Sequence, residues 1–319
     1  MEEIFMTDHD VAIKRLKGKL KKNWRDWLFV ALLLALPIAS FAVFWLYVNF
    51  EGIVMAFQQM DPVTNTEYFT LDNFKEVFLD MGKDGGLVGE SLLNTFLIYG
   101  AGVFIATPIT IVIAFFMMKG MPMTNFYKVL FFLPSMISQV AFVYVFMYFI
   151  GGSGPIKEIY INMGGSADNF SVFLGEGWAM LTILFFGIWS SYGYSTIVYA
   201  STMNRIPPEL FESAKLDGAG FGTEFFKICL PLIWPTISTF IVVNLAGSCS
   251  GPGVVLLMTG GSFHTNTVGY WMYDVVSNSG DGSNMYYPAA FGLVISLFLV
   301  PLVWIVRKIV NSFWQDAQY

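Results

Sequence analysis

Charged residues are scarce in this chain of 319 residues. They make up 13% of the sequence, against 55% for hydrophobic residues. A soluble globular domain typically carries about a quarter charged residues, so this composition excludes an ordinary soluble domain and predicts an integral membrane protein. The net charge of −6 says little about partners, because the charges are sorted along the chain.

Cysteine and histidine are scarcer still, with two residues of each: Cys229, Cys249, His9 and His264. Two cysteines make neither a disulfide framework nor a metal cluster, and we interpret them as small buried residues of helices. The histidines fall in a tail and in a loop, which does not suggest a metal site. The sequence therefore predicts no bound metal.

Catalytic motifs are missing as well. The chain has no Gly-rich phosphate cradle, and so no means of binding ATP by that route. It also lacks a Ser-His-Asp set, a His-Glu-x-x-His motif and paired carboxylates within its apolar segments, which weighs against an intramembrane enzyme or a proton relay. We therefore predict a protein with no catalysis of its own and no cofactor.

What the chain does have is long hydrophobic runs. A helix needs about twenty apolar residues to cross a bilayer, and six runs reach this length. The first run is too long for a cleavable signal peptide, and no small-residue cleavage site follows it. The sequence predicts an all-α integral membrane protein with six transmembrane helices. The predicted spans are residues 27–49, 91–117, 125–150, 178–202, 230–258 and 287–310.

Basic residues are sorted to one side of these spans. Fourteen of the seventeen lie in the N-terminal tail, in or beside the connections after the second and fourth spans, and at the end of the last span; the exceptions are Lys75, Lys83 and Lys157. Because basic loops stay in the cytoplasm, we predict cytoplasmic tails at 1–26 and 311–319 around a membrane domain of residues 27–310. On the opposite side, loop 50–90 is acidic; we interpret it mainly as a solvated face, with contact to a soluble partner as the alternative.

The connection between the fourth and fifth spans, residues 203–229, has the pattern of a short amphipathic helix. Apolar residues from Leu210 to Leu216 alternate with charges at near-helical spacing. Pro208 suits the first turn of such a helix, and Gly218 suits its end. A folded helix in this loop indicates an element that docks to something outside the membrane. An ordinary solvated loop is the alternative.

The fifth span contains the sequence Gly251-Pro252-Gly253. Proline removes a backbone hydrogen bond and glycine adds conformational freedom, so we expect the helix to be interrupted here. Broken backbone at membrane depth is tolerated only where protein buries it or a water-filled cavity receives it, and it often marks a transport site. We expect the following residues, Thr259–Thr267, to form a tight loop that dips toward the pore.

Uncharged polar residues form stripes on three spans. Their spacing of three, four or seven residues places each set on one helical face. Such residues can simply join helices by hydrogen bonds worth about 0.6 kcal/mol each. Three stripes beside a helix break favour a shared polar cavity instead, and its hydroxyl, amide and aromatic groups suit a neutral polyol. The stripes are Ser135 and Gln139; Gly187, Ser190, Ser191 and Tyr194, with Trp189 beside them; and Asn244, Gly247 and Ser248.

The connector also carries a specific motif. Glu212-Ser213-Ala214, Asp217-Gly218-Ala219 and the ending Ile228-x-Leu230-Pro231 resemble the EAA loop of permease subunits of binding-protein-dependent ABC importers, with Ser213 in place of the usual Ala. The resemblance covers nearly the whole chain and includes residues 71–74, 130–135 and 258–261. The last of these is similar to a loop of the carbohydrate branch, in the subunit that resembles the maltose-type first permease.

The resemblance implies the six-helix fold of type I ABC importer permeases, in a bacterial inner or plasma membrane. It implies that the connector helix inserts into a cleft of a cytoplasmic ATPase. The coupling residues would be Glu212, Ser213, Ala214, Asp217, Gly218 and Ala219. The implied partners are a second homologous permease, the ATPase dimer, an extracytoplasmic solute-binding protein and membrane lipid, with no nucleic acid.

The resemblance also implies a sugar or oligosaccharide as the substrate, because the pocket positions of the maltose-type permease fall on the three stripes. Identities differ at most of these positions, so the sugar need not be maltose. Ser250–Gly253 replaces a Phe-rich, Asp-ended stretch, which is compatible with a wider passage for a longer oligosaccharide. The alternatives are a permease for another solute, such as glycerol phosphate or an amino acid, and a channel or scaffold working alone. The absence of basic residues from the interior of the spans argues against an anionic substrate.

Overall fold

The computed structural model describes residues 24–61, 63–64, 66–83, 86–166, 173, 175–278 and 285–313. Within these ranges, six helical stretches are long and apolar enough to cross a membrane, and the one sheet is a two-stranded hairpin. The predicted all-α membrane fold is therefore confirmed. The predicted tails lie outside the described residues, apart from 24–26 and 311–313.

The first, second and sixth spanning stretches are longer than the predicted spans, and three of the six contain a π-helical segment. The first consists of α2 (Trp24–Ser40), η1 (Phe41–Tyr47) and α3 (Val48–Ala56). The second consists of α5 (Leu87–Ala101), η2 (Gly102–Ala106) and α6 (Thr107–Met118). The fourth is α10 (Ala179–Met203) and the sixth is α16 (Tyr286–Ser312). The third runs from Gln139 to Asn162 and contains α8 (Gln139–Ile150) and α9 (Pro155–Asn162). The shorter elements that connect or cap these stretches are β1 (Gln58–Met60), β2 (Glu67–Phe69), α4 (Asp72–Met81), α11 (Pro208–Leu216) and α15 (Val268–Ser277).

The third predicted span, 125–150, is two helices rather than one. α7 (Thr124–Met136) ends two residues after Pro134, and α8 (Gln139–Ile150) begins after extended backbone at Ile137 and Ser138. Pro134 has no N–H to donate, and the Ser135 hydroxyl donates to a carbonyl of its own turn at 2.7 Å, which competes with the helix ladder. The prediction that Ser135 and Gln139 share one helical face is therefore wrong, because the helix is interrupted between them.

The fifth span is interrupted where the sequence predicts. α12 (Phe221–Thr223), the π-helical η5 (Glu224–Cys229) and α13 (Leu230–Gly247) form one spanning stretch, and α14 (Gly253–Met258) follows the break. Gly253 has φ +55°, a left-handed conformation that glycine adopts without strain. The stretch begins at Phe221, before the predicted start at residue 230, so the connector is shorter than predicted.

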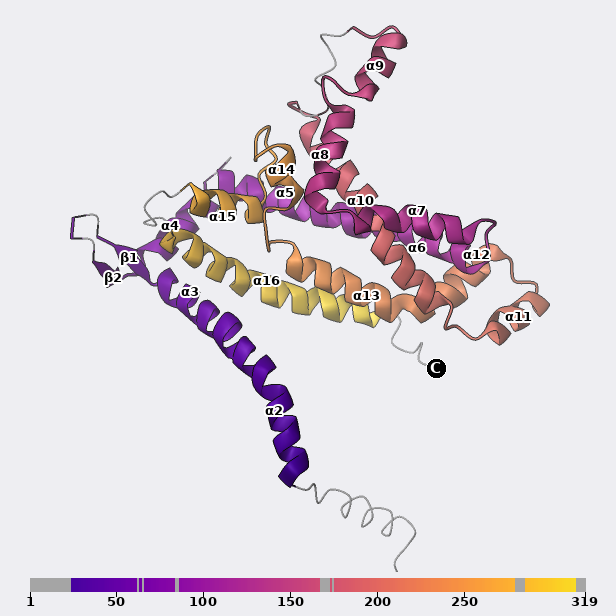
Figure 1. Ribbon diagram of the computed structural model, residues 1–319, viewed down its shortest axis with the longest axis horizontal. Helices are drawn as coiled ribbons and strands as arrows, with labels where there is room; N and C mark the ends of the chain where they lie inside the picture. The colour runs from indigo at the N-terminus through magenta and orange to yellow at the C-terminus, as the bar shows by residue number, and fades with distance from the viewer. Residues whose placement is uncertain are drawn as a thin grey trace, which may run out of the picture.

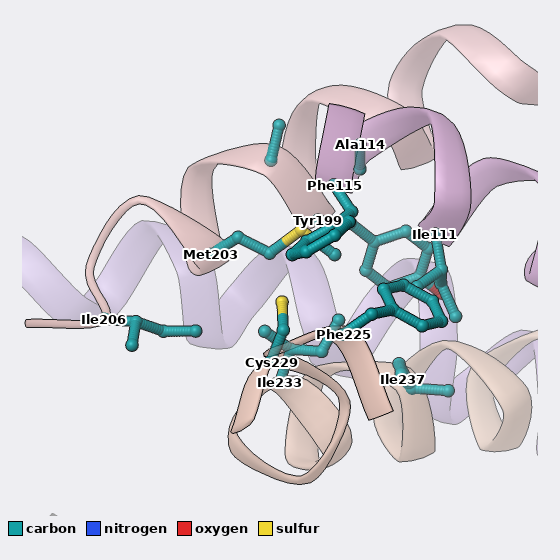
Figure 2. Packing of buried hydrophobic residues seen from close by; sticks show 11 residues of the cluster. Ile111, Ala114, Phe115, Tyr199, Met203, Ile206, Phe225, Cys229, Ile233 and Ile237 are labelled. Atoms are coloured by element: carbon teal, nitrogen blue, oxygen red, sulfur yellow. The ribbon is translucent and has the colours of Figure 1, made fainter. Parts of the chain in front are cut away.

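α10 forms the centre of the bundle. It packs against α6 and α7 on one side and α13 on another, while α13 and α16 lie side by side (Figure 1). The approach to α7 is close, since a Cβ at Gly193 would lie 2.4 Å from the Phe131 carbonyl oxygen. Figure 2 shows a buried apolar cluster that joins α6, α10, η5 and α13, with Tyr199 and Phe115 at its centre. Cys229 lies in this cluster and is buried, as predicted, whereas Cys249 is half-buried and lies in the break after α13, so the prediction of a buried helical residue is wrong for Cys249.

The first spanning stretch stands away from the other helices at its N-terminal end (Figure 1). From residue 26 to residue 56, Ala56 alone is buried, although the stretch is rich in large apolar side chains. Contiguous apolar surface of this size needs hydrocarbon or another protein around it.

The residues after the first span form a folded cap on the N-terminal end of α16. β1 and β2 pair antiparallel, and the buried Asn73 of α4 donates to the Gln58 carbonyl at 2.7 Å and to the Ala56 carbonyl at 3.3 Å. The hydroxyl of Tyr287 in α16 donates to Asp80 at 2.7 Å. The acidic loop is therefore partly a structural element and not only a solvated face.

Candidate functional site

A cavity of about 320 Å³ lies between the second, fourth and fifth spanning stretches and reaches the helix break after Gly247. Its wall is built by α5, η2, α10, α13 and the start of α14, and no charged side chain of the described residues lines it. Glycine and aliphatic residues make up most of the wall. The cavity is therefore neutral and mainly apolar, with a few polar groups, as is typical of small-molecule sites. The side chains that give it polarity are Thr95, Tyr99, Ser191, Asn244, Ser248 and Thr267.

The structure brings two of the three predicted stripes together at this cavity. Gly187 and Ser191 of α10 line it from one side, and Asn244 of α13 and Ser248, directly after α13, line it from another. These residues are separated by more than fifty positions in the sequence, so their convergence depends on the packing of α10 against α13.

The other members of these two stripes lie outside the cavity wall. Ser190 donates to the Gly187 carbonyl at 3.2 Å within its own helix, and Gly247 is the last residue of α13. The ring of Tyr194 packs against Phe240 at 6.1 Å between centroids.

The remaining predicted pocket residues lie elsewhere in the structure, away from the cavity. The Trp189 ring packs against Phe142 of α8 at 4.8 Å and lines a separate apolar groove. Ser135 and Gln139 are exposed at the two sides of the break between α7 and α8. Neither of them lines the cavity.

The second spanning stretch contributes a wall that the sequence analysis missed. Thr95 and Tyr99 of α5 line the cavity, followed by Gly102 and Ala106 of η2. Thr95 and Tyr99 are four residues apart, the same helical periodicity that identified the other stripes, so the signal was present in the sequence. The π-helical turn at η2 widens the helix locally, and such turns are frequent at functional sites.

Most polar groups of the cavity already have hydrogen-bond partners in the chain. Thr95 donates to a carbonyl of its own helix at 2.7 Å, and Tyr99 donates to a carbonyl of α13 at 3.2 Å. Ser191 donates to a carbonyl of its own helix, and Ser248 donates to the Leu245 carbonyl at the end of α13, both at 2.8 Å. The exposed amide of Asn244 has no partner among the described residues. Since an amide offers two donors and an acceptor, Asn244 is the side chain best able to bind a polar ligand.

The loop Thr259–Thr267 is held against the second spanning stretch. The Asn94 amide donates to the carbonyls of His264 and Asn266 at 2.9 and 2.8 Å, and the Thr95 hydroxyl accepts from the N–H of Val268 at 3.0 Å. The predicted tight loop is therefore present. Its last residue, Thr267, caps α15 and lines the cavity.

Two further contacts define this loop. A Cβ at Gly269 would lie 2.0 Å from the Gly251 carbonyl oxygen, so the start of α15 packs directly on the helix break. The His264 ring lies 3.1 Å from a carboxylate oxygen of Glu90, and the hydrogen bond and charge of that carboxylate raise the pKa of His264 above its ordinary value.

The predicted connector helix is α11, and local chemistry explains both of its ends. Pro208 stands in the first turn, where a missing N–H costs nothing. At the other end Gly218 has φ +78°, its N–H donates to the Lys215 carbonyl at 3.0 Å, and the Ala219 N–H donates to the Ala214 carbonyl at 2.8 Å. These two bonds form a Schellman motif, in which a left-handed glycine closes the helix.

α11 lies at the end of the bundle opposite the hairpin of β1 and β2 (Figure 1). Phe211 is half-buried against the cluster of Figure 2 and attaches the helix to the bundle. The opposite surface is free, and Leu216 is 90% exposed. Among the predicted coupling residues, Glu212, Ser213, Asp217 and Gly218 are exposed, and Ala214 and Ala219 are half-buried.

Comparison with known proteins identifies the family. The model of the binding-protein-dependent transport system inner membrane component matches residues 106–315, which is well over half of the chain and includes α11 and the helix break. The chain belongs to this family. It is thus a multi-pass membrane subunit of a binding-protein-dependent transport system.

Relatives of this family member include permeases with different named substrates. It is 28% identical to the polygalacturonan/rhamnogalacturonan transport system permease protein YteP of Bacillus subtilis, over 67% of this chain and 66% of that one. It is 27% identical to the multiple sugar-binding transport system permease protein MsmF of Streptococcus mutans, over 88% and 92%. It is 25% identical to the sn-glycerol-3-phosphate transport system permease protein UgpA of Shigella flexneri, over 92% and 96%.

A solved structure shares the fold of this permease. It is a chain of a bacterial ABC transporter involved in the import of the acidic polysaccharide alginate, with a TM-score of 0.76 and 22% identity over 94% of this chain and 99% of that one. The six-helix arrangement described above is therefore that of an ABC importer permease.

Proposed function

We propose that this permease forms half of the translocation pathway of an ATP-driven importer for neutral sugars or oligosaccharides. The observation that carries the proposal is the uncharged cavity at the helix break, with the unpaired Asn244 amide in its wall. Hydroxyl groups of a sugar would exchange hydrogen bonds with Asn244, and the aliphatic wall would cover its apolar faces.

The charge of the cavity distinguishes among the substrates named for the relatives. A phosphate or carboxylate in a largely apolar site needs a basic partner, because an unpaired charge away from water is costly. Among the residues that the structure describes, no lysine or arginine lines this cavity. This favours a neutral saccharide over glycerol phosphate and over uronate sugars.

Coupling to a separate ATPase is the second part of the proposal. α11 is a rigid helix with a closed C-terminal end and a free outer surface, so an ATPase cleft can hold it as one body. Glu212, Ser213, Ala214, Asp217, Gly218 and Ala219 would form this contact. The sorted basic residues support a cytoplasmic position for α11 and for both termini.

Further partners follow from surfaces that the fold leaves open. The exposed stretch from α2 to α3 would be covered by lipid and by a second, homologous permease. The cap formed by β1, β2 and α4 would face outward and receive a solute-binding protein. A channel or scaffold working alone would need neither a second permease nor a solute-binding protein, and it leaves the folded connector without a role.

Uptake in proteoliposomes tests the substrate. The complete transporter, reconstituted with its partners, would be supplied with neutral oligosaccharides, a uronate oligosaccharide and sn-glycerol 3-phosphate. We expect ATP-dependent uptake of a neutral sugar, and we expect Asn244→Leu to raise its KM or slow its uptake about 2- to 10-fold, the loss of one hydrogen bond.

Thr239→Ala is the matched control, since Thr239 is an exposed residue of the same helix that does not line the cavity. Uptake of glycerol phosphate or uronate alone would refute the neutral substrate class. Equal uptake in Asn244→Leu and the parent protein would refute the role of Asn244.

A further inference from the structure

A shielded ion pair joins the second spanning stretch to the fifth. Lys119 follows α6 directly, and its ammonium group pairs with the carboxylate of Glu224, the first residue of η5. The side chains are 24% and 5% exposed, respectively. A carboxylate buried to this extent depends on its partner, so the contact differs from an incidental pair of surface charges.

The same ammonium group also contacts the connector helix. It lies 4.4 Å from the ring centroid of Phe211 in α11 and 5.5 Å from that of Phe115 in α6, both within the range of cation–π attraction. Phe211 is the residue before Glu212, where the coupling motif begins. One side chain therefore contacts α11, the end of the second spanning stretch and the start of the fifth.

We propose that Lys119 is a positioning residue that transmits movement of α11 to the cavity. This rests on the proposed coupling function of α11. Because α6 continues from α5 and η2, which supply Tyr99, Gly102 and Ala106 to the cavity wall, a displacement of α11 would pull on that wall through Lys119. Glu224 holds the ammonium group in place, and Phe211 is its contact on the moving helix.

The aromatic surroundings support a rigid connection at this point. The Phe115 ring packs against Phe221 at 4.8 Å and against Phe225 at 5.0 Å between centroids, so α6, α12 and η5 already form one packed unit. Lys119 extends this unit to α11. If Lys119 lost its charge, α11 would keep the apolar packing of Phe211 but lose the contact between the ammonium group and the Phe211 ring.

The test compares transport with ATP hydrolysis in the complete reconstituted transporter. Lys119→Met keeps an unbranched apolar stem and removes the charge. We expect ATP hydrolysis to continue while the amount of substrate imported per ATP falls at least about fivefold, the lower end of typical coupling between sites. Lys128→Met is the matched control, because Lys128 is an exposed lysine of the next helix, α7, outside the ion pair; its transport per ATP should stay unchanged.

A charge reversal tests whether the ion pair itself is required, and removal of both charges separates positioning from simple stabilisation. Lys119→Glu and Glu224→Lys should each be defective, and the double variant should regain at least half of the transport per ATP. If a single variant does not fold, Lys119→Met with Glu224→Met removes both charges and leaves no unpaired one; this protein should assemble and still be poorly coupled.

Three outcomes would overturn the proposal. The first is normal transport per ATP in Lys119→Met, or in the double methionine variant. The second is a parallel loss of hydrolysis and uptake with lower thermal stability, which is what a merely structural pair predicts. The third is a charge-reversed double variant that assembles and is as uncoupled as the single variants. Gly218→Val separates the coupling function of α11 from the role of Lys119. Normal uptake in Gly218→Val would refute coupling through α11 itself. Defective uptake in Gly218→Val together with normal transport per ATP in Lys119→Met would refute only the role of Lys119.

Discussion

Gly218 is the position where one methyl group should weaken coupling without any clash. Its φ of +78° lies in the left-handed region, where a Cβ costs about 1–2 kcal/mol. A Cβ built on Gly218 meets no atom within 4 Å, so the entire cost is backbone strain. Because Gly218 closes the C-terminal end of α11 through the Schellman bonds, this strain acts directly on the shape of the proposed coupling element.

We therefore expect Gly218→Ala to lower the ratio of closed to open C-terminal ends of α11 by about 5- to 30-fold. This factor corresponds to a cost of about 1–2 kcal/mol. Asn tolerates left-handed backbone better than Ala, and a β-branched residue tolerates it worse. ATP-dependent uptake should therefore be highest in Gly218→Asn, lower in Gly218→Ala and lowest in Gly218→Val, while membrane insertion stays unchanged.

Gly220 provides the control for this series. It also has no atom within 4 Å of an added Cβ, but its φ is −83°, which any residue adopts. Gly220→Ala should therefore couple normally. The assay is uptake and ATP hydrolysis in proteoliposomes at equal amounts of inserted protein. Normal uptake in Gly218→Val, or an equal loss in Gly220→Ala, would refute the reasoning.

Two further predictions concern other parts of the fold. Gly193→Val should lower the free energy of unfolding by about 1–3 kcal/mol, since its Cβ would lie 2.4 Å from the Phe131 carbonyl oxygen. Gly89→Ala is the control, because its Cβ meets no atom within 4 Å. Thermal unfolding of the purified protein should be unchanged in this control. Because Glu90 raises the pKa of His264, the stabilisation of loop 259–267 by this pair is present below the unfolded pKa of about 6.5 and is lost as pH rises through the higher folded pKa. Hydrogen-exchange protection of this loop should therefore increase from about pH 8 to about pH 6 in the parent protein and not in Glu90→Gln; equal behaviour of the two proteins would exclude the pair as the cause.

The membrane fold was predictable because the bilayer imposes its thickness on the sequence. Runs of about twenty apolar residues recur along the chain, and each of the six matches or overlaps a spanning stretch. The ends of α11 were predictable for a different reason, since Pro208 and Gly218 act on backbone within one turn. The same local effect of Gly251, Pro252 and Gly253 predicted the interruption of the fifth helix.

The cavity was predictable only in part. Periodicity identifies a polar face on a helix, and it found Ser191 and Asn244, which line the cavity. It gives no information on which neighbour that face meets, so Tyr194 was included although its ring packs on Phe240. Periodicity also assumes an unbroken helix, and this assumption failed between Ser135 and Gln139.

By itself, the sequence determined that the chain lies in a membrane, where its helices run, how α11 begins and ends, and where the fifth helix breaks. Each of these depends on apolar runs or on backbone chemistry within a few residues. Only the tertiary structure decided that Thr95 and Asn244 face one cavity, and that Lys119 reaches Glu224 across 105 positions. Such contacts are set by how closely helices approach, as at Gly193, where the absence of a side chain lets α10 touch the backbone of α7.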